Sequence, residues 1–123
     1  MTSLGDDVFV AHQKSQQVEV YDAVTLTLQR RIAVPGLGRL ISLYGLVTCP
    51  NNNCLYASDC NDIHRVELSG SNAVKKWSVA GTPGGLSVNV AHNLVVACNT
   101  ANKLQEYTTH GSLVREMSAV SVY

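Results

Sequence analysis

The sequence predicts an all-β chain built from repeated four-stranded units, as in a β-propeller. Apolar and polar residues alternate with period two throughout, and Gly, Asn, Ser and Pro bound the alternating stretches. No window of about eleven residues keeps the 3/4 apolar spacing of an amphipathic helix. Similar strands begin at Val8, Leu55 and Leu94, which are offset by 47 and 39 residues. These offsets are in the range of four-stranded propeller blades.

The first repeat, residues 1–34, is expected to begin at its second strand. Its three expected strands are Val8–Ala11, Val18–Tyr21 and Leu26–Val34. The other two repeats, residues 35–79 and 80–123, follow the breakers at 35–38 and 80–85 and are expected to hold four strands each. Those strands are Leu40–Thr48, Leu55–Asp59, Ile63–Leu68 and Val74–Val79, then Leu86–Val90, Leu94–Ala97, Leu104–Tyr107 and Leu113–Met117. The total expected is eleven strands.

Equivalent positions of the three repeats should share the same environment. We expect burial at two sets of matched positions and a place for Trp77 in the core between two blades. The sets are Tyr21, Val66 and Tyr107, and Val10, Ala57 and Val96.

Composition favours a globular domain without a polyanionic partner. Apolar residues make up 46% of the chain, and nine basic side chains balance nine acidic ones. The apolar runs are too short to cross a membrane, and the N-terminal residues do not resemble a secretory signal. A cytoplasmic location is therefore favoured.

The repeats resemble the NHL family of propeller repeats. Leu55-Tyr56-Ala57-Ser58-Asp59 and Ile63-His64-Arg65-Val66 match the family motif best, and Gly85-Leu86-Ser87-Val88-Asn89 resembles its first strand. The resemblance covers nearly the whole chain and extends to the YVTN and WD40-like groups. It implies a closed propeller, commonly of six blades, that mostly recognises protein partners and in some cases RNA.

Three blades cannot close a ring, and an arc of three leaves two blade faces without neighbours. Either the chain is a piece of a longer propeller, or two copies pair into a six-bladed ring. We favour the homodimeric ring, in which residues 119–123 would supply the inner strand missing from the first blade of the partner.

The four cysteines give only a weak indication of a metal site or a disulfide. Cys49, Cys54, Cys60 and Cys98 contain no Cys-x2-Cys pair, which argues against a zinc site. Cys49 and Cys54 flank a four-residue loop, so a disulfide between them is an alternative to reduced thiols at strand ends.

His12, Asp59 and Cys98 occupy the same position in successive repeats, where the second strand ends. All three residue types can bind metals, but equivalent positions on neighbouring blades diverge from the axis. We therefore expect Asp59 to support its turn by accepting backbone hydrogen bonds, and we expect no metal or other cofactor.

Basic pairs at 30–31 and 75–76, with Arg115 in the third repeat, lie at matched positions of the outermost strands. Such charges discourage edge-to-edge association of sheets, and aromatic residues for stacking bases are few, so RNA binding is the less favoured alternative.

An enzyme is also not favoured. The expected innermost strands, Leu40–Thr48 and Leu86–Val90, contain no Asp, Glu or His to hold a metal or activate water. A hydrolase or lactonase whose site is completed by other blades remains the alternative.

The sequence thus predicts a non-catalytic module that binds or scaffolds protein partners. The candidate surface is the set of loops between second and third strands, which lie at one rim. Its residues are His12, Lys14, Gln16, Asp59, Asn61, Asp62, Asn99, Asn102 and Lys103.

Overall fold

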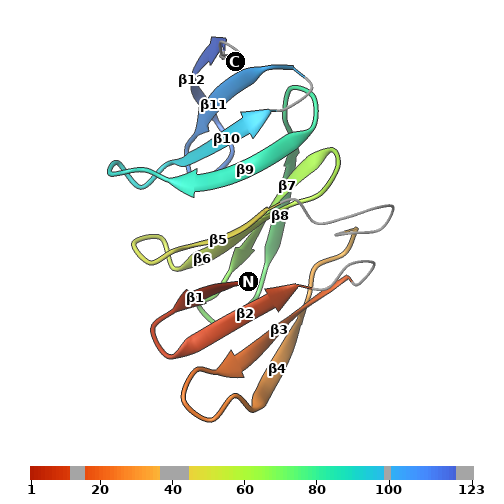
Figure 1. Ribbon diagram of the computed structural model, residues 1–123, viewed down its shortest axis with the longest axis vertical. Helices are drawn as coiled ribbons and strands as arrows, with labels where there is room; N and C mark the ends of the chain where they lie inside the picture. The colour runs from red at the N-terminus through yellow and green to blue at the C-terminus, as the bar shows by residue number, and fades with distance from the viewer. Residues whose placement is uncertain (12–15, 37–44, 99–100, 119–123) are drawn as a thin grey trace, which may run out of the picture.

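The computed structural model describes residues 1–11, 16–36, 45–98 and 101–118, and its regular structure there is entirely β-strand. Twelve strands form three antiparallel sheets, each made of four strands that follow one another in the sequence (Figure 1). The first sheet holds β1 (Thr2–Leu4), β2 (Asp7–Ala11), β3 (Gln17–Asp22) and β4 (Leu28–Ala33). The middle sheet holds β5 (Gly45–Cys49), β6 (Cys54–Ser58), β7 (Asp62–Glu67) and β8 (Val74–Ser78). The last sheet holds β9 (Pro83–Val88), β10 (Leu94–Cys98), β11 (Lys103–Tyr107) and β12 (Leu113–Ser118).

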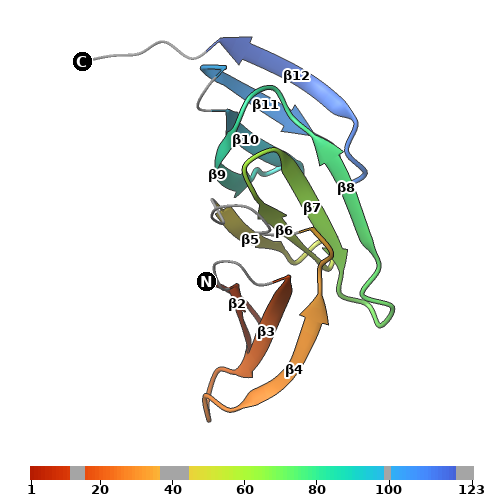
Figure 2. The same ribbon diagram turned by 90° about the vertical axis from the view of Figure 1, so that its right-hand side faces the viewer.

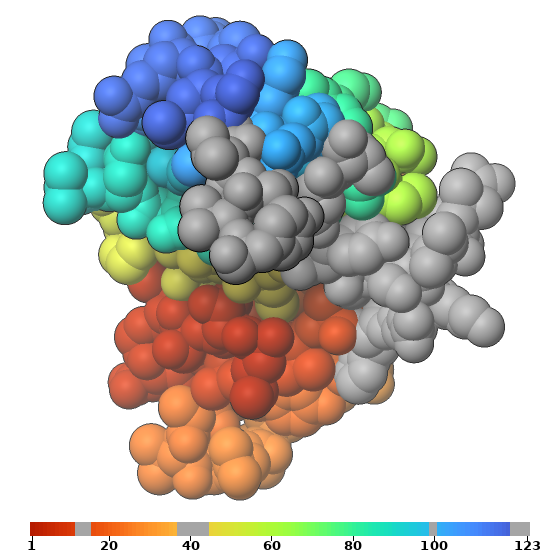
Figure 3. All heavy atoms as spheres, turned by 45° about the horizontal axis from the view of Figure 1, so that its top comes forward, coloured from red at the N-terminus to blue at the C-terminus, as the bar shows by residue number. Residues whose placement is uncertain are grey.

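The three sheets pack face to face through two apolar layers, and Figure 3 shows them as successive bands from the N-terminal to the C-terminal residues. In the side view β4, β8 and β12 lie along the outer side of the stack, while β5 and β9 lie on the opposite side (Figure 2). The inner strands of neighbouring sheets contact one another, β1 with β5 and β5 with β9. The all-β class and the arrangement in four-stranded units are therefore confirmed. The part of the chain that the structure describes holds no helix able to span a membrane.

The first sheet is complete, so the expectation that it begins at its second strand is wrong. Thr2–Leu4 forms the inner strand β1 and pairs with Asp7–Phe9 of β2. Gly5 has a φ of +58° in the two-residue turn between them, a conformation that glycine adopts at no steric cost. A strand of three residues is too short for its alternation to be recognised in the sequence. Because β1 already fills the inner position, a partner's tail has no missing strand to supply.

The inner strands of the other two sheets also differ from expectation. Residues 40–44 of the expected strand lie outside the described part, and β5 is seen from Gly45 onward. β9 begins at Pro83, so the Gly-Gly pair expected as a breaker belongs to the strand. A Cβ at Gly45 would lie 2.9 Å from Leu86 Cγ and 3.3 Å from the carbonyl oxygen of Gly84. The glycine permits this close approach of two inner strands.

Registers confirm the alignment of the three repeats. In the pairs of second and third strands, Val8 lies opposite Tyr21, Leu55 opposite Val66, and Leu94 opposite Tyr107. In the outer pairs, Val18, Ile63 and Leu104 lie opposite Ile32, Trp77 and Met117. The same sequence position therefore has the same structural position in each sheet.

The core is divided into two apolar layers, one on each side of the middle sheet. The first layer joins the first and middle sheets through Phe9, Val18, Val20, Ile32, Val34, Leu55, Ala57 and Val66. The second joins the middle and last sheets through Cys49, Cys54, Tyr56, Ile63, Leu94, Val96, Cys98 and Tyr107. All five residues of β6 are buried because both faces of that strand are covered.

Burial at the matched positions follows from this stacking. Ala57, Val66, Val96 and Tyr107 are buried as expected, whereas Val10 and Tyr21 are half-buried. Val10 and Tyr21 belong to the first sheet and point away from the middle one, so no described sheet covers them.

Trp77 lies between two sheets, as predicted. Its ring is 6.4 Å from that of Tyr56 in its own sheet and 5.8 Å from that of Tyr107 in the last sheet. Gly111, with a φ of +89°, lies under the indole, and a Cβ there would come within 2.8 Å of the ring. The contact thus depends on a glycine in the β11–β12 turn.

Candidate functional site

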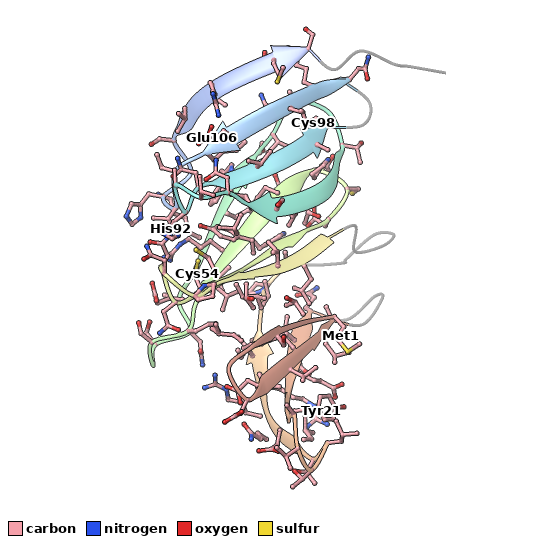
Figure 4. All side chains as sticks on the ribbon, turned by 60° about the vertical axis from the view of Figure 1, so that its left-hand side comes forward. Met1, Tyr21, Cys54, His92, Cys98 and Glu106 are labelled. Carbon is pink, nitrogen blue, oxygen red and sulfur yellow. The ribbon has the colours of Figure 1, made fainter. Side chains whose placement is uncertain are left out.

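The candidate surface is the edge of the stack where second strands turn into third strands. Antiparallel order places these turns at the same edge as the connections that leave the outer strands. Two contacts show that outer-strand connections lie beside the third strand of the next sheet. A Cβ at Gly36, after β4, would lie 3.9 Å from His64 Cε1. Ala80, after β8, donates its N–H to Gln105 Oε1 at 3.3 Å. We call this edge the connection rim. Figure 4 shows Cys98 at this edge and His92 at the opposite one.

The β6–β7 turn is held by Asp59. One carboxylate oxygen of Asp59 accepts the backbone N–H groups of Asn61 and Asp62, both at 2.9 Å. The other lies 2.7 Å from Nε2 of the buried His64. Burial alone would raise the pKa of Asp59, but these N–H groups and the imidazole outweigh it, so the pKa lies below the ordinary value. The expected turn-supporting role of Asp59 is what the geometry shows.

The same turn leaves Asn61 exposed. Its backbone is fixed by Asp59, and among the described residues its side-chain amide reaches only the Cys60 sulfur, at 3.4 Å. Asp62 is half-buried and accepts the Ser78 hydroxyl at 2.9 Å. Asn61 is therefore a polar side chain on a rigid support, which suits recognition.

The β2–β3 turn contributes Gln16. Its side chain is exposed, and its carbonyl oxygens accept the N–H groups of Val34 and Gly36 at 2.8 and 3.2 Å. Gln16 thus ties its turn to the end of β4. His12 and Lys14, which the sequence also proposed for this surface, lie outside the described residues.

The β10–β11 turn contributes Asn102 and Lys103. Asn102 is exposed and has a φ of +55°, and Lys103 pairs with Glu116 at 3.0 Å. The third candidate of this turn, Asn99, lies outside the described residues. The structure therefore brings the six described candidates to one edge, but it commits Asp59 and part of Gln16 to holding the turns.

One group of side chains on this rim has the composition of a metal site. Ligand atoms of Asp59, Asp62 and His64 lie within 4.8 Å of one another. Asp59 uses one oxygen for two N–H groups and the other for His64, while Asp62 accepts from Ser78. These bonds explain the cluster as a lock on the turn. His64 Nδ1 is buried and has no hydrogen-bond partner among the described residues.

Among the described residues, no cysteine belongs to a group of side chains spaced to hold a metal ion. All four are free thiols, and Cys49 and Cys54 lie directly opposite each other in the β5–β6 ladder, both fully buried. Burial raises the pKa of the Cys54 and Cys98 thiols, which keeps them protonated. Cys60 is the half-exposed one.

The polar groups of the described inner strands are hydroxyls and one thiol, that of Cys49. β1, β5 and β9 contain no Asp, Glu or His, and Thr48 donates its hydroxyl to the Ser3 carbonyl at 2.8 Å.

The opposite edge shows features that the sequence did not indicate. Thr109 Oγ1 lies 2.9 Å from both the Tyr56 hydroxyl and Arg65 Nε, and Asn52 donates to the His92 carbonyl oxygen at 3.1 Å. These bonds join the middle sheet to turns of the last sheet. No sequence pattern signals them, because each joins residues 40 or more positions apart.

Comparisons with known proteins give the fold. Solved structures similar to this chain include Kuenenia stuttgartiensis hydrazine synthase, with a TM-score of 0.78 and 20% identity over 94% of this chain and 33% of that one. They also include a streptogramin B lyase, with a TM-score of 0.72 and 14% identity over 91% of this chain and 37% of that one. Virginiamycin B lyase from Staphylococcus aureus has a TM-score of 0.73 and 17% identity over 91% of this chain and 37% of that one. These are propeller proteins. The chain has the β-propeller fold.

This propeller chain spans about a third of the length of those structures. No family model and no curated protein matches it, so the NHL resemblance is not supported at the level of the family. Each four-stranded sheet is a blade. At identities of 13–20%, the similarity to these proteins concerns the fold alone.

Proposed function

We propose that this propeller segment is a non-catalytic module that binds a protein partner through its connection rim. The observation that carries the proposal is the β6–β7 turn, where the bonds of Asp59 fix the backbone and leave Asn61 exposed. A rigid turn loses little conformational entropy on binding, which favours recognition by polar side chains.

The lack of acidic or histidine side chains in the described inner strands supports a binding role over catalysis. The net charge of zero supports a protein partner over RNA, because binding to nucleic acid rests on clustered positive charge. The rim also carries both signs of charge, since Lys103 and Glu116 form an ion pair at 3.0 Å and Asp62 begins β7, directly after the β6–β7 turn.

A matched pair of asparagines tests the proposal. Asn61 is exposed on the connection rim, and Asn51 is exposed in the β5–β6 turn at the opposite edge. A photo-crosslinking residue at each position, followed by identification and purification of the captured protein, gives a defined partner. Binding of that partner should weaken at least tenfold with Asn61→Arg and stay unchanged with Asn51→Arg, since about 1.4 kcal/mol corresponds to tenfold.

Equal crosslinking at both edges, or equal affinities of both variants, would overturn the proposal. Loss of the captured partner on nuclease treatment would instead favour RNA binding, and affinity would then fall steeply with salt.

A further inference from the structure

We propose that two copies of this 123-residue chain associate head to tail, through the free face of the last blade and the free face of the first. We call the face of a blade that points toward the C-terminal end of the stack its leading face. The face that points toward the N-terminal end is its trailing face. Tyr21 on the first blade and Glu106 on the last lie toward opposite ends of the stack (Figure 4). The proposal concerns assembly and does not depend on the rim function.

The chain already makes the same interface twice. The leading face of the first blade presents Phe9, Val18 and Ile32, which are buried against the middle blade. The leading face of the middle blade presents Tyr56, Ile63 and Trp77 to the last blade. Strand registers place Val95, Leu104 and Met117 of the last blade at these same positions.

No described residue covers this last leading face. Leu104 is 36% exposed and Met117 60% exposed, although the matched Ile63 and Ile32 are fully buried. A hollow of about 420 Å³ lies over this face and is lined by both residues together with Val95 and Arg115. Apolar side chains at positions that are buried or half-buried in both other blades indicate that a third blade face belongs there.

The first blade presents the complementary face. Trailing faces bury Leu55, Ala57 and Val66 in the middle blade and Leu94, Val96 and Tyr107 in the last. The matched residues of the first blade are Val8, Val10 and Tyr21, which are only half-buried. Within the described residues, one leading face and one trailing face are therefore left uncovered, and they correspond to the two halves of the internal interface.

The buried carboxylate on the leading face of the last blade, that of Glu106, already has partners. Glu106 accepts hydrogen bonds from Asn89 and Asn93 at 3.0 and 2.8 Å and pairs with Arg115 at 2.6 Å. Covering the face therefore leaves no carboxylate unsatisfied. Two copies joined in this way have two identical interfaces, and three blades from each close a ring of six.

The mass of the purified chain in solution is the first test. Light scattering behind a sizing column should give twice the chain mass of 13.2 kDa. A monomer at the highest concentration that the chain reaches would overturn the proposal. A mass that keeps growing with concentration would also overturn it, because the contact would then form an open filament.

Two blocking variants distinguish head-to-tail packing from other dimers. Leu104→Arg blocks the leading face and Val10→Arg the trailing face, while Val90→Arg, at a side chain 98% exposed in the β9–β10 turn, is the control. Each blocking variant alone should be a monomer, and the control a dimer. Circular dichroism confirms that each variant is folded.

An equimolar mixture of the two blocking variants should recover a dimer. In the mixture, the intact leading face of the Val10→Arg copy meets the intact trailing face of the Leu104→Arg copy, which restores one of two interfaces. Dimers that survive both single substitutions, or a mixture that stays monomeric, would contradict the head-to-tail arrangement. If a variant fails to fold, the mass of the unmodified chain still decides.

Discussion

Replacing Trp77 by Ala should destabilise the chain by about 3 kcal/mol. A buried tryptophan removes about 150–250 Å² from water, and the lower figure suits this half-buried ring. At about 25 cal/mol per Å², the loss is about 4 kcal/mol. The indole N–H is buried without a hydrogen-bond partner among the described residues, so its removal returns about 1 kcal/mol. The remainder lies at the low end of the usual range for Trp→Ala.

Urea unfolding followed by far-UV circular dichroism measures this loss without relying on tryptophan fluorescence, since Trp77 is the one tryptophan. Trp77→Phe keeps an aromatic ring between Tyr56 and Tyr107 and removes the unpaired donor, so it should cost about 1 kcal/mol. Val90→Ala, at an exposed side chain, should change stability by less than about 0.5 kcal/mol. A loss below about 1 kcal/mol for Trp77→Ala would refute the placement of this ring in the interface between blades.

Three further predictions concern single positions. Gly111→Ala combines a positive φ with a Cβ 2.8 Å from Trp77 and should lower the free energy of unfolding by about 2–3 kcal/mol. Gly70→Ala, with a positive φ in open space, should lower it by about 1 kcal/mol. Equal losses in urea unfolding would contradict the contact between Gly111 and Trp77. Hydrogen bonds from Asn93, Asn89 and Arg115 lower the pKa of Glu106 to about 2, so the stability it adds is complete above its ordinary pKa of 4.5 and is lost as pH falls toward 2. Melting temperature should accordingly fall less steeply over that acidic window in Glu106→Gln than in the parent chain, and parallel curves would argue against these bonds. Cys60 should react with a thiol reagent well before the three buried cysteines, and Cys60→Ser should abolish the fast phase; a fast phase that survives would show that a buried thiol is accessible.

The sequence was sufficient for the class, the repeat and most strands, because every blade is a local meander whose alternation is visible over five or six residues. It failed at β1, where three residues are too few to show alternation, and at Pro83–Gly85, where residues typical of a turn form the start of β9. Local turn chemistry made the role of Asp59 predictable from the residue type and its place after a strand.

Its partner His64 was out of reach of the sequence alone. Alternation places His64 in a strand, but only the stacking of the first blade against the middle one buries it and directs it to Asp59. The same applies to Thr109, which contacts Tyr56 and Arg65 across more than forty residues. Such contacts are set by the packing of blades, which no local pattern encodes.

The middle blade, covered on both faces, also sets the order in which the chain acquires structure. In a linear array each unit is stabilised by its neighbours, so the unit with two neighbours is the last to open and a natural place for folding to start. Backbone amides of β6 and β7 should exchange with deuterium most slowly, and those of β3 and β11 sooner. Head-to-tail association would give the outer blades a second neighbour and remove this gradient, so exchange rates along the chain report whether a ring has formed.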